Sequence, residues 1–339
     1  MHSHSNRKRD HIDICLGPDI EHNSSSGFDA YQFLHVALPE INYEEIELQV
    51  SFLGHNISAP LFISGMTGGI NDAVSINGEL AELCSEMNIP FVLGSQRSML
   101  HNLASDESFT IARKRAPNGL ISANIGATEI ACKDHHEGIL SIIDRIHANF
   151  LTVHANPLQE LFQPEGNTRF SGVLQGIEEI RKRIDIPIIV KEVGSGISLE
   201  MAKKLHDIGV DAIDVAGKGG TSWSAVEMKR NQSEFSEYFR EWGMPTSYCL
   251  LSLREYCSKV GMSILSSGGI RSTHDIAMSI AMGAKSVGMA RPILLAYHED
   301  GIHAVQTLLE DHMKNLKRIM FLTGSNDCNQ LSNAMFRKI

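Results

Sequence analysis

The sequence of 339 residues predicts a single (β/α)₈ barrel with an amino-terminal extension. From Pro60 onward, short apolar segments alternate with helical patterns, and eight such segments occur. Alternating strands and helices indicate a parallel sheet, and eight strands are the number that closes a barrel. An open, doubly wound sheet is the alternative. No Gly-x-Gly-x-x-Gly follows the first strand, so we favour the barrel, spanning residues 60–339.

The segment ahead of the barrel, residues 1–59, is predicted to be an arm and extension rather than an independent domain. It begins with a basic run, NRKRDHIDI at 6–14. Such a run is usually a solvated surface, unless it folds back over a site that binds an anion. Residues 19–26 are polar and turn-prone, which predicts an arm that is mobile before a ligand binds. Residues 23–59 are expected to form a short hairpin that covers the barrel floor.

The eight predicted strands are short and apolar. They are expected at residues 61–65, 91–94, 120–123, 151–154, 188–191, 212–216, 264–266 and 286–289. Helical periodicity between them predicts helices at 78–87, 108–114, 138–147, 173–184, 199–208, 247–260 and 274–282. Gly209 and Gly283 follow two of these helical runs, where helices commonly stop.

One connection, residues 217–246, is much longer than a usual βα loop and carries Trp223 and Trp242. Long loops at the active-site end of a barrel tend to be lids, so a mobile lid that orders over the ligand is predicted. The alternative is a surface excursion with its own small helix.

The composition is that of an ordinary globular chain, with 42% hydrophobic and 21% charged residues. The formal net charge of −10 at pH 7 argues against general nucleic-acid binding. No apolar run approaches the length of about 18 residues that a membrane span needs, and the amino terminus lacks the apolar segment of a secretory signal. The six cysteines form no Cys-x-x-Cys pair and mostly lie in apolar segments. We therefore expect a reducing, cytoplasmic location.

Small and polar residues follow the predicted strands, and in a barrel the carboxyl ends of the strands line one site. In chain order they are Gly65, Met66, Thr67, Ser95, Gln96, Arg97, Asn124, His154, Asn156, Gln159, Glu160, Lys191, Thr221, Gly268, Gly269, Ala290 and Arg291. A lone Asn or Lys would mean little. A ring of such residues at successive strand ends is a much stronger indication of a binding site.

The most informative stretch is SILSSGGIRSTHDIAMSIAMGAKSVGMARP, residues 263–292. Its small residues at 266–269 let backbone N–H groups approach an anion, and the helix after Arg291 directs its positive dipole end the same way. In (β/α)₈ barrels the loops after strands 7 and 8 often bind phosphate. Arg291 favours such a site over an ordinary βαβ unit with a glycine turn.

Lys191 follows an apolar run and is expected to project into the barrel mouth, where its burial requires an anionic partner. A Schiff-base lysine is one interpretation. A flavin fits the surrounding residues better. Lys191 would then lie near the N1/C2 carbonyl edge, Asn124 near the pyrimidine ring, and the phosphate near Gly268, Gly269 and Arg291.

Gln159 and Glu160 form the other unusual pair. Gln159 can donate and accept hydrogen bonds but cannot ionise, whereas Glu160 is a hard oxygen ligand that suits Mg²⁺ together with substrate phosphates. The alternative for Glu160 is that it simply caps or begins the next segment. With the cations of the 6–14 run and Arg97, these residues predict a diphosphate substrate lying over the flavin.

Nine motifs closely resemble those of type 2 isopentenyl-diphosphate delta-isomerases, the FMN-dependent form, over nearly the whole chain. They are RKRDH at 7–11, GMTGG at 65–69, GSQR at 94–97, SANIGA at 122–127, HANPLQE at 154–160, VKEVG at 190–194, GKGGTSW at 217–223, SSGGIR at 266–271 and GMARP at 288–292. The motif at 154–160 is the most diagnostic.

The resemblance implies reversible interconversion of isopentenyl and dimethylallyl diphosphate by a 1,3-allylic proton shift, with FMN reduced by NADPH and with Mg²⁺ held by Glu160. The catalytic residues it implies are Gln159, His154 and Lys191. The substrate contacts it implies are Arg7, Lys8, His11, Ser95, Gln96, Arg97, His154, Asn156 and Gln159. The FMN contacts it implies are Gly65, Met66, Thr67, Ser95, Asn124, Lys191, Thr221, Gly268, Gly269, Arg271, Ala290 and Arg291. It also implies a homo-oligomer, tetrameric or octameric, without nucleic-acid or membrane partners.

Protonation of an alkene needs a general acid, yet no Asp, Cys or Tyr stands at a predicted strand end beside the site. Reduced flavin as acid and base, with Gln159 orienting or relaying, explains that absence. FMN-dependent 2-hydroxy-acid oxidases resemble the same barrel but carry a catalytic His and an Arg after strand 6, where this chain has GKGGT at 217–221. IMP dehydrogenase-like enzymes need a Cys in that loop. A non-catalytic flavin-binding barrel remains the third alternative, although the substrate half of the site is present.

Overall fold

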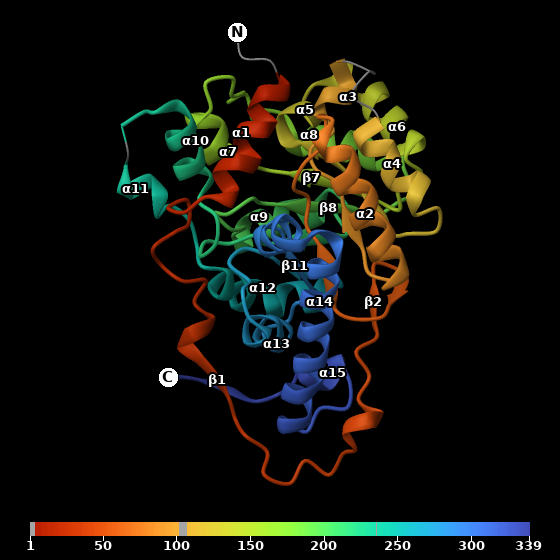
Figure 1. Cartoon of the computed structure of the whole chain (residues 1–339), viewed down its shortest axis with the longest axis vertical. Coiled ribbons are helices and arrows are strands. Elements are labelled where there is room, and N and C mark those ends of the chain that lie inside the picture. The colour runs from red at the N-terminus through yellow and green to blue at the C-terminus, as the bar shows by residue number, and fades with distance from the viewer. Residues whose placement is uncertain (1–3, 102–106, 235) are drawn as a thin grey trace.

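The structure, a computed structural model, describes residues 4–101, 107–234 and 236–339. Residues 1–3 of the predicted arm and residue 235 of the long connection lie outside the described residues. Eight parallel strands close into a barrel in the order β10-β11-β4-β5-β6-β7-β8-β9, which confirms the predicted fold class (Figure 1). The strands are β4 (Leu61–Ile63), β5 (Phe91–Val92), β6 (Ile121–Gly126), β7 (Phe150–His154), β8 (Ile188–Lys191), β9 (Ala212–Asp214), β10 (Ser263–Ser266) and β11 (Ser286–Met289).

All seven predicted helices are present. They are α2 (Asp72–Glu86), α4 (Glu107–Arg115), α6 (His136–Arg145), α8 (Val173–Arg181), α9 (Leu199–Asp207), α12 (Thr246–Val260) and α13 (Thr273–Ala281). The largest difference is at α2, which begins at Asp72 rather than at 78. Gly209 and Gly283 have φ of +82° and +108°, a left-handed conformation that suits glycine at the end of a helix.

Other helices lie outside these seven predicted ranges; a helix after Arg291 and a small helix within 217–246 were considered, but without bounds. These other helices are α1 (His4–Leu16), α3 (Arg97–His101), α5 (Ala127–Ile130), α7 (Pro157–Phe162), α10 (Trp223–Asn231), α11 (Glu237–Arg240), α14 (Arg291–Leu322) and α15 (Cys328–Leu331). The longest, α14, consists of two helices joined at a kink at Asp300 and Gly301. α1 carries mostly polar and charged side chains and packs against α10 and α14. Its helical state therefore depends on tertiary contacts more than on an apolar stripe. Within the described ranges, no helix combines the length and apolar character of a membrane span.

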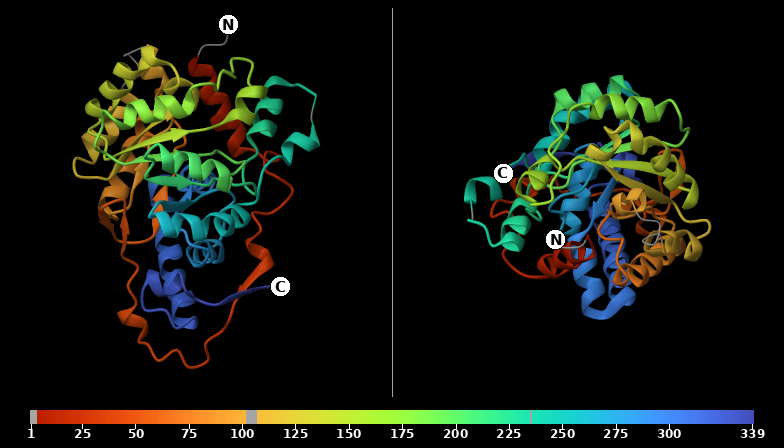
Figure 2. Two further views of the ribbon diagram at one scale, coloured as in Figure 1. Left: turned by 180° about the vertical axis from the view of Figure 1, so that it is seen from behind. Right: turned by 90° about the horizontal axis from the view of Figure 1, so that it is seen from above.

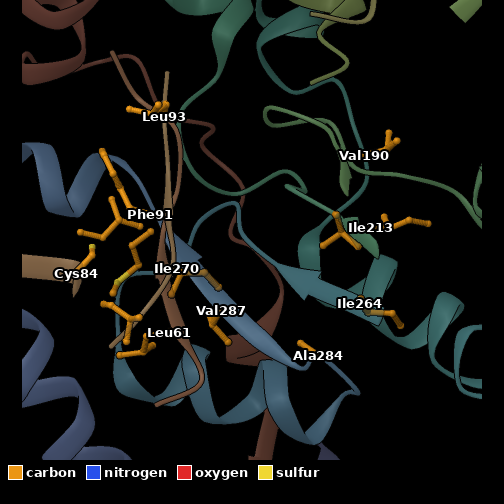
Figure 3. Packing of buried hydrophobic residues seen from close by; sticks show 14 of the residues in the cluster. Leu61, Cys84, Phe91, Leu93, Val190, Ile213, Ile264, Ile270, Ala284 and Val287 are labelled. Atoms are coloured by element: carbon orange, nitrogen blue, oxygen red, sulfur yellow. The ribbon is translucent and has the colours of Figure 1, made fainter. Parts of the chain in front are cut away.

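Two apolar cores share the barrel strands. Leu61, Val190 and Ile264 point outward into the layer between strands and helices (Figure 3). Their neighbours Phe62 and Ile189 point inward, as the two-residue period of a strand requires. The outer core joins the helices to the sheet, and the inner core fills the amino-terminal end of the barrel.

The extension contributes a hairpin, as predicted, made of β2 (Val50–Phe52) and β3 (His55–Ile57). Phe52 contacts Phe62 and Phe150, with ring centroids 6.1 and 5.2 Å away, and so closes the inner core. A second pairing was not predicted: β1 (Tyr31–Phe33) runs antiparallel to β12 (Phe336–Lys338). Figures 1 and 2 show α1 at one end of the molecule and the β1–β12 sheet towards the other.

Candidate active site

A cavity of about 460 Å³ lies at the carboxyl-terminal end of the barrel. Small-molecule sites commonly enclose roughly 300–1,000 Å³. Residues that follow all eight strands line it, and α1 contributes Arg7, Lys8 and His11. The cavity brings together every predicted site residue except Gln96. Gln96 is fully buried, and its side-chain oxygen accepts the backbone N–H of Asn124 at 3.0 Å, so it supports the wall from behind.

His154, at the end of β7, is held by Asn124. The Asn124 side-chain nitrogen donates to the Leu93 carbonyl at 2.8 Å, which turns its oxygen towards His154. The His154 Nδ1 lies 2.8 Å from that oxygen. An amide oxygen only accepts hydrogen bonds, so Nδ1 carries the proton and Nε2 remains an acceptor.

Electrostatics keep this histidine neutral. Burial, together with the charges of Lys191, Lys8 and Arg97, lowers the pKa of His154 to about 3. A bound anion would offset those three cations and would therefore raise this pKa. His154 is thus a neutral imidazole whose protonation depends on what occupies the cavity.

The cations from α1 are unusually desolvated. The Lys8 ammonium donates to the Ser95 carbonyl at 3.0 Å and lies 5.2 Å from the ring centre of Phe109. Burial, and then the neighbouring Arg7, lower the pKa of Lys8 to about 7. Burial and the charge of Arg97 likewise lower the pKa of Arg7. Desolvated cations that repel one another favour an anionic ligand between them.

Gln159 is fixed at both ends. Its oxygen accepts from Asn156 Nδ2 at 3.1 Å, and its nitrogen donates to Glu227 Oε1 at 3.1 Å. The same Glu227 oxygen lies 2.8 Å from His11 Nε2, and the other carboxylate oxygen accepts from Arg230 at 3.0 Å. Glu227 therefore connects α1, α7 and α10.

Sequence reasoning missed Glu227. Burial alone would raise its pKa, but hydrogen bonds from His11, Gln159 and Arg230 hold the pKa below its ordinary value, so the carboxylate is charged. It lies on α10, inside the connection 217–246 that was interpreted as a lid. The available signal was its i, i+3 spacing to Arg230. α10 buries residues 224–228, so this part is more than a surface excursion.

Glu160 also lines the cavity. Its Oε1 accepts from Asn156 Nδ2 at 3.0 Å and its Oε2 from the backbone N–H of Asn167 at 2.5 Å. Within the described ranges, no group of three or more His, Cys, Asp or Glu side chains is placed to hold a metal ion. A single carboxylate suits Mg²⁺, which takes one or two carboxylates and completes its shell with water and phosphate oxygens.

The glycine turn after β10 is closely packed. Gly268 and Gly269 have φ of +95° and +71°, and a Cβ on Gly268 would lie 2.2 Å from the Gly217 carbonyl oxygen. Only glycine fits such a position.

Two arginines flank this turn, and both pair with Glu21. Arg271 and Arg291 approach its two carboxylate oxygens at 2.8 and 2.9 Å. Arg291 also donates to the carbonyls of Cys15 and Gly17 at 2.8 and 3.0 Å, at the carboxyl end of α1. Arg291 therefore also anchors the arm, and Glu21 was not foreseen from the sequence.

Comparison with known proteins identifies the family. The FMN-dependent dehydrogenase family model matches residues 18–113 and 145–338. An isopentenyl-diphosphate delta-isomerase of Chlorobaculum parvum is 43% identical over 98% of this chain and 97% of its own length. One from Pyrococcus furiosus is 40% identical over 96% of this chain and 84% of its own. The chain belongs to the isopentenyl-diphosphate delta-isomerase family.

A flavocytochrome b2 double mutant with pyruvate bound shares the fold, with a TM-score of 0.72 at 16% identity over 96% of this chain and 82% of that one. That likeness shows the fold alone. In this chain the segment 217–221 has neither His nor Arg, the two residues expected there in a 2-hydroxy-acid oxidase.

The residues present fit FMN, the cofactor of the matched family. Among the described residues, Ser64 Oγ and Thr67 Oγ1 have no hydrogen-bond partner, and both are buried at the cavity wall. A Cβ on Gly65 would lie 2.5 Å from the Leu93 carbonyl oxygen, so the wall there is bare backbone. Lys191 supplies a buried cation, and the glycine turn supplies an anion-binding backbone. The role of each individual residue stays a prediction.

Proposed function

We propose that this chain interconverts isopentenyl diphosphate and dimethylallyl diphosphate in the cavity above the barrel. The observation that carries the proposal is the presence of two cationic regions in one cavity. The glycine turn with Arg271 and Arg291 suits the FMN phosphate, while Arg7, Lys8 and Arg97 suit a diphosphate. Gln159 lines the same cavity.

Reduced FMN, when bound, supplies the proton donor and acceptor for the 1,3-shift. The chain's own residues bind and orient. Lys8 and its neighbouring arginines hold the diphosphate, and His154 takes up a proton as the anion raises its pKa. Gln159, held between Asn156 and Glu227, keeps a neutral carboxamide at the reacting end, where it orients the alkene.

α1 and α10 exclude water from the reacting carbons. His11 of α1 meets Glu227 of α10, so the arm and the long connection are linked through one carboxylate. Water exclusion strengthens every electrostatic interaction inside the site. We propose that both segments are mobile without substrate and order over it.

Four further points belong to this proposal. Glu160 binds Mg²⁺ together with the diphosphate, supported by its hard oxygen atoms at the cavity wall. NADPH reduces FMN, as the family resemblance implies. The chain acts in the cytoplasm as a homo-oligomer, tetrameric or octameric, which is supported by exposed apolar side chains such as Leu38, 82% exposed.

The test is anaerobic turnover of isopentenyl diphosphate in deuterated water with FMN, Mg²⁺ and NADPH, followed by NMR. We expect deuterium-labelled dimethylallyl diphosphate, with NADPH needed only to prime the flavin. NADPH consumption in step with substrate would instead indicate a reductase on the same scaffold. No reaction would favour a non-catalytic flavin-binding barrel.

A further inference from the structure

A buried carboxylate lies beneath the cavity without lining it. Asp214 ends β9 and is 1% exposed. Its Oδ1 accepts from Ser267 Oγ at 2.7 Å, but its Oδ2 is buried with no hydrogen-bond partner in the part of the chain that the structure describes. An incompletely satisfied buried carboxylate is costly, so a compensating interaction is expected.

Lys191 is the charged neighbour of this carboxylate. Burial raises the pKa of Asp214, and the charge of Lys191 is the largest of the effects that lower it. Lys191 ends β8, lies opposite Asp214 in the strand register and reaches the cavity floor. Its ammonium donates to the Glu192 carbonyl at 2.7 Å. Burial lowers the pKa of Lys191, while the charge of Asp214, followed by that of Glu192, raises it.

The other groups facing Lys191 cannot replace Asp214. Glu192 Oε2 accepts the backbone N–H groups of Val193, Gly194 and Ser195 at 2.6, 2.8 and 2.6 Å, so it is already satisfied by the following loop. His154 on β7 is neutral, because its pKa is lowered to about 3.

We propose that Asp214 is the counter-ion that keeps Lys191 protonated at the cavity floor, and is thereby a positioning residue for the charge beside FMN. The inference rests on the proposed function only in that FMN occupies this cavity. Charge close to the flavin ring tunes its electronic properties. A protonated Lys191 favours the negative charge that a reduced ring can carry, and Asp214 extends the pH range over which that proton is retained.

The first experiment compares the midpoint potential of bound FMN in the wild type and in Asp214→Asn from about pH 6 to about pH 9, since an ordinary lysine titrates near 10.4. Near pH 6 Lys191 is protonated in the variant but the Asp214 anion is missing. The midpoint potential of bound FMN should therefore be higher in the variant than in the wild type. As the pH rises Lys191 loses its proton early, and the excess should shrink or reverse. A difference that stays constant across the range, or no difference, would overturn the proposal.

The control is Asp211→Asn, which makes the same substitution at the residue just before β9, whereas Asp214 is the last residue of that strand. Asp211 accepts from Arg181 and from the Ile188 backbone N–H, at the amino-terminal end of the barrel. This variant should lose stability without changing the pH dependence of the potential. Lost stability alone therefore cannot imitate the predicted effect.

A second experiment needs no flavin and stands if a single variant folds poorly. Lys191→Met leaves the Asp214 carboxylate buried without a neighbouring cation. Removing one partner of a buried charge pair is strongly destabilising. The Lys191→Met/Asp214→Asn double variant should therefore have a higher apoprotein Tm than Lys191→Met alone. If adding Asp214→Asn to Lys191→Met lowered the Tm further, the proposed charge interaction between Lys191 and Asp214 would be wrong. Failure of wild-type turnover would refute the proposed function without affecting this result.

Discussion

The two ends of the barrel are built from the same strands but differ in what they bury: apolar surface at one end and polar or charged groups at the other. At the amino-terminal end Phe52 closes on Phe62 and Phe150, and apolar surface is buried completely. At the carboxyl-terminal end Lys191 and Asp214 are buried and His154 is partly buried, with their charges or hydrogen bonds only partly satisfied. One end stabilises the fold, and the other retains interactions that a ligand can complete.

Two partly buried cations show the difference. Arg113, near the amino-terminal ends of β6 and β7, donates to the carbonyls of Ala116, Pro117, Gly119, Ile146 and His147 and to the Asn149 side chain. Lys8, at the opposite end, donates to the Ser95 carbonyl and its pKa falls to about 7. A cation satisfied by backbone carbonyls is structural, whereas one that is desolvated and repelled by its neighbours suits an incoming anion.

Removing the Phe52 ring from the amino-terminal end of the barrel should have the largest effect, and it should affect stability alone. Phe52→Ala is expected to lower the free energy of unfolding by about 3–5 kcal/mol, because a buried aromatic ring is lost and a cavity remains. Denaturant titration measures this, and turnover at low temperature should be unchanged. Ser51→Ala, at the exposed neighbouring position of β2, is the control and should be nearly neutral. A loss of kcat without lost stability would break the comparison between the two ends.

Removing the Gln159 carboxamide should have the opposite result, with turnover lost and stability kept. Gln159→Ala is expected to lower kcat roughly 100-fold with little change in Tm, a cost of the size found for preorganised hydrogen-bonding groups. Turnover by NMR and a thermal melt report the two quantities. Gln175→Ala, on the exposed side of α8, is the matched control and should leave both unchanged. If Gln159→Ala mainly unfolds the protein, Gln159 belongs with the structural residues.

The depressed pKa of Lys8 makes substrate binding pH-dependent. Above about pH 7 free Lys8 is mostly neutral, and a bound diphosphate must raise its pKa and draw in a proton. KM should therefore rise with pH from about 7, by up to about tenfold per pH unit. Lys8→Arg, which stays charged, should flatten this rise, and Lys8→Met should raise KM at every pH. A wild-type KM that is independent of pH would contradict the assignment.

The smallest effect is expected at Arg9, two positions from Arg7. Arg9 pairs with Asp72 at 2.6 Å, but both side chains are more than half exposed. Exposed pairs contribute little, so Arg9→Ala should change neither KM nor Tm measurably. Arg7→Ala removes a partly buried cation from the cavity and should raise KM by about tenfold or more. Equal effects of the two variants would show that the arm acts through general charge rather than through placed residues.

Sequence patterns alone predict the barrel and most of the residues that line its cavity. Local pattern is sufficient for the strands, because a short apolar run between turn residues has few alternatives. The glycine turn needs only residues 266–269, since its backbone leaves no room for a Cβ at Gly268. Strand ends of a closed barrel meet at one edge, so the residues that follow them converge without knowledge of the loops.

Tertiary structure decided which of these side chains face the ligand and what supports them. Gln96 follows a strand like its neighbours, yet its side chain accepts a hydrogen bond from the Asn124 backbone instead of lining the cavity. The two-residue alternation of a strand no longer predicts side-chain direction after the strand has ended. Glu21 and Glu227 acquire their partners from segments about 200 residues or more away, and β1 pairs with β12 across nearly the whole chain. Such contacts leave no local periodicity, and burial changes the pKa of a side chain only after the chain has folded around it.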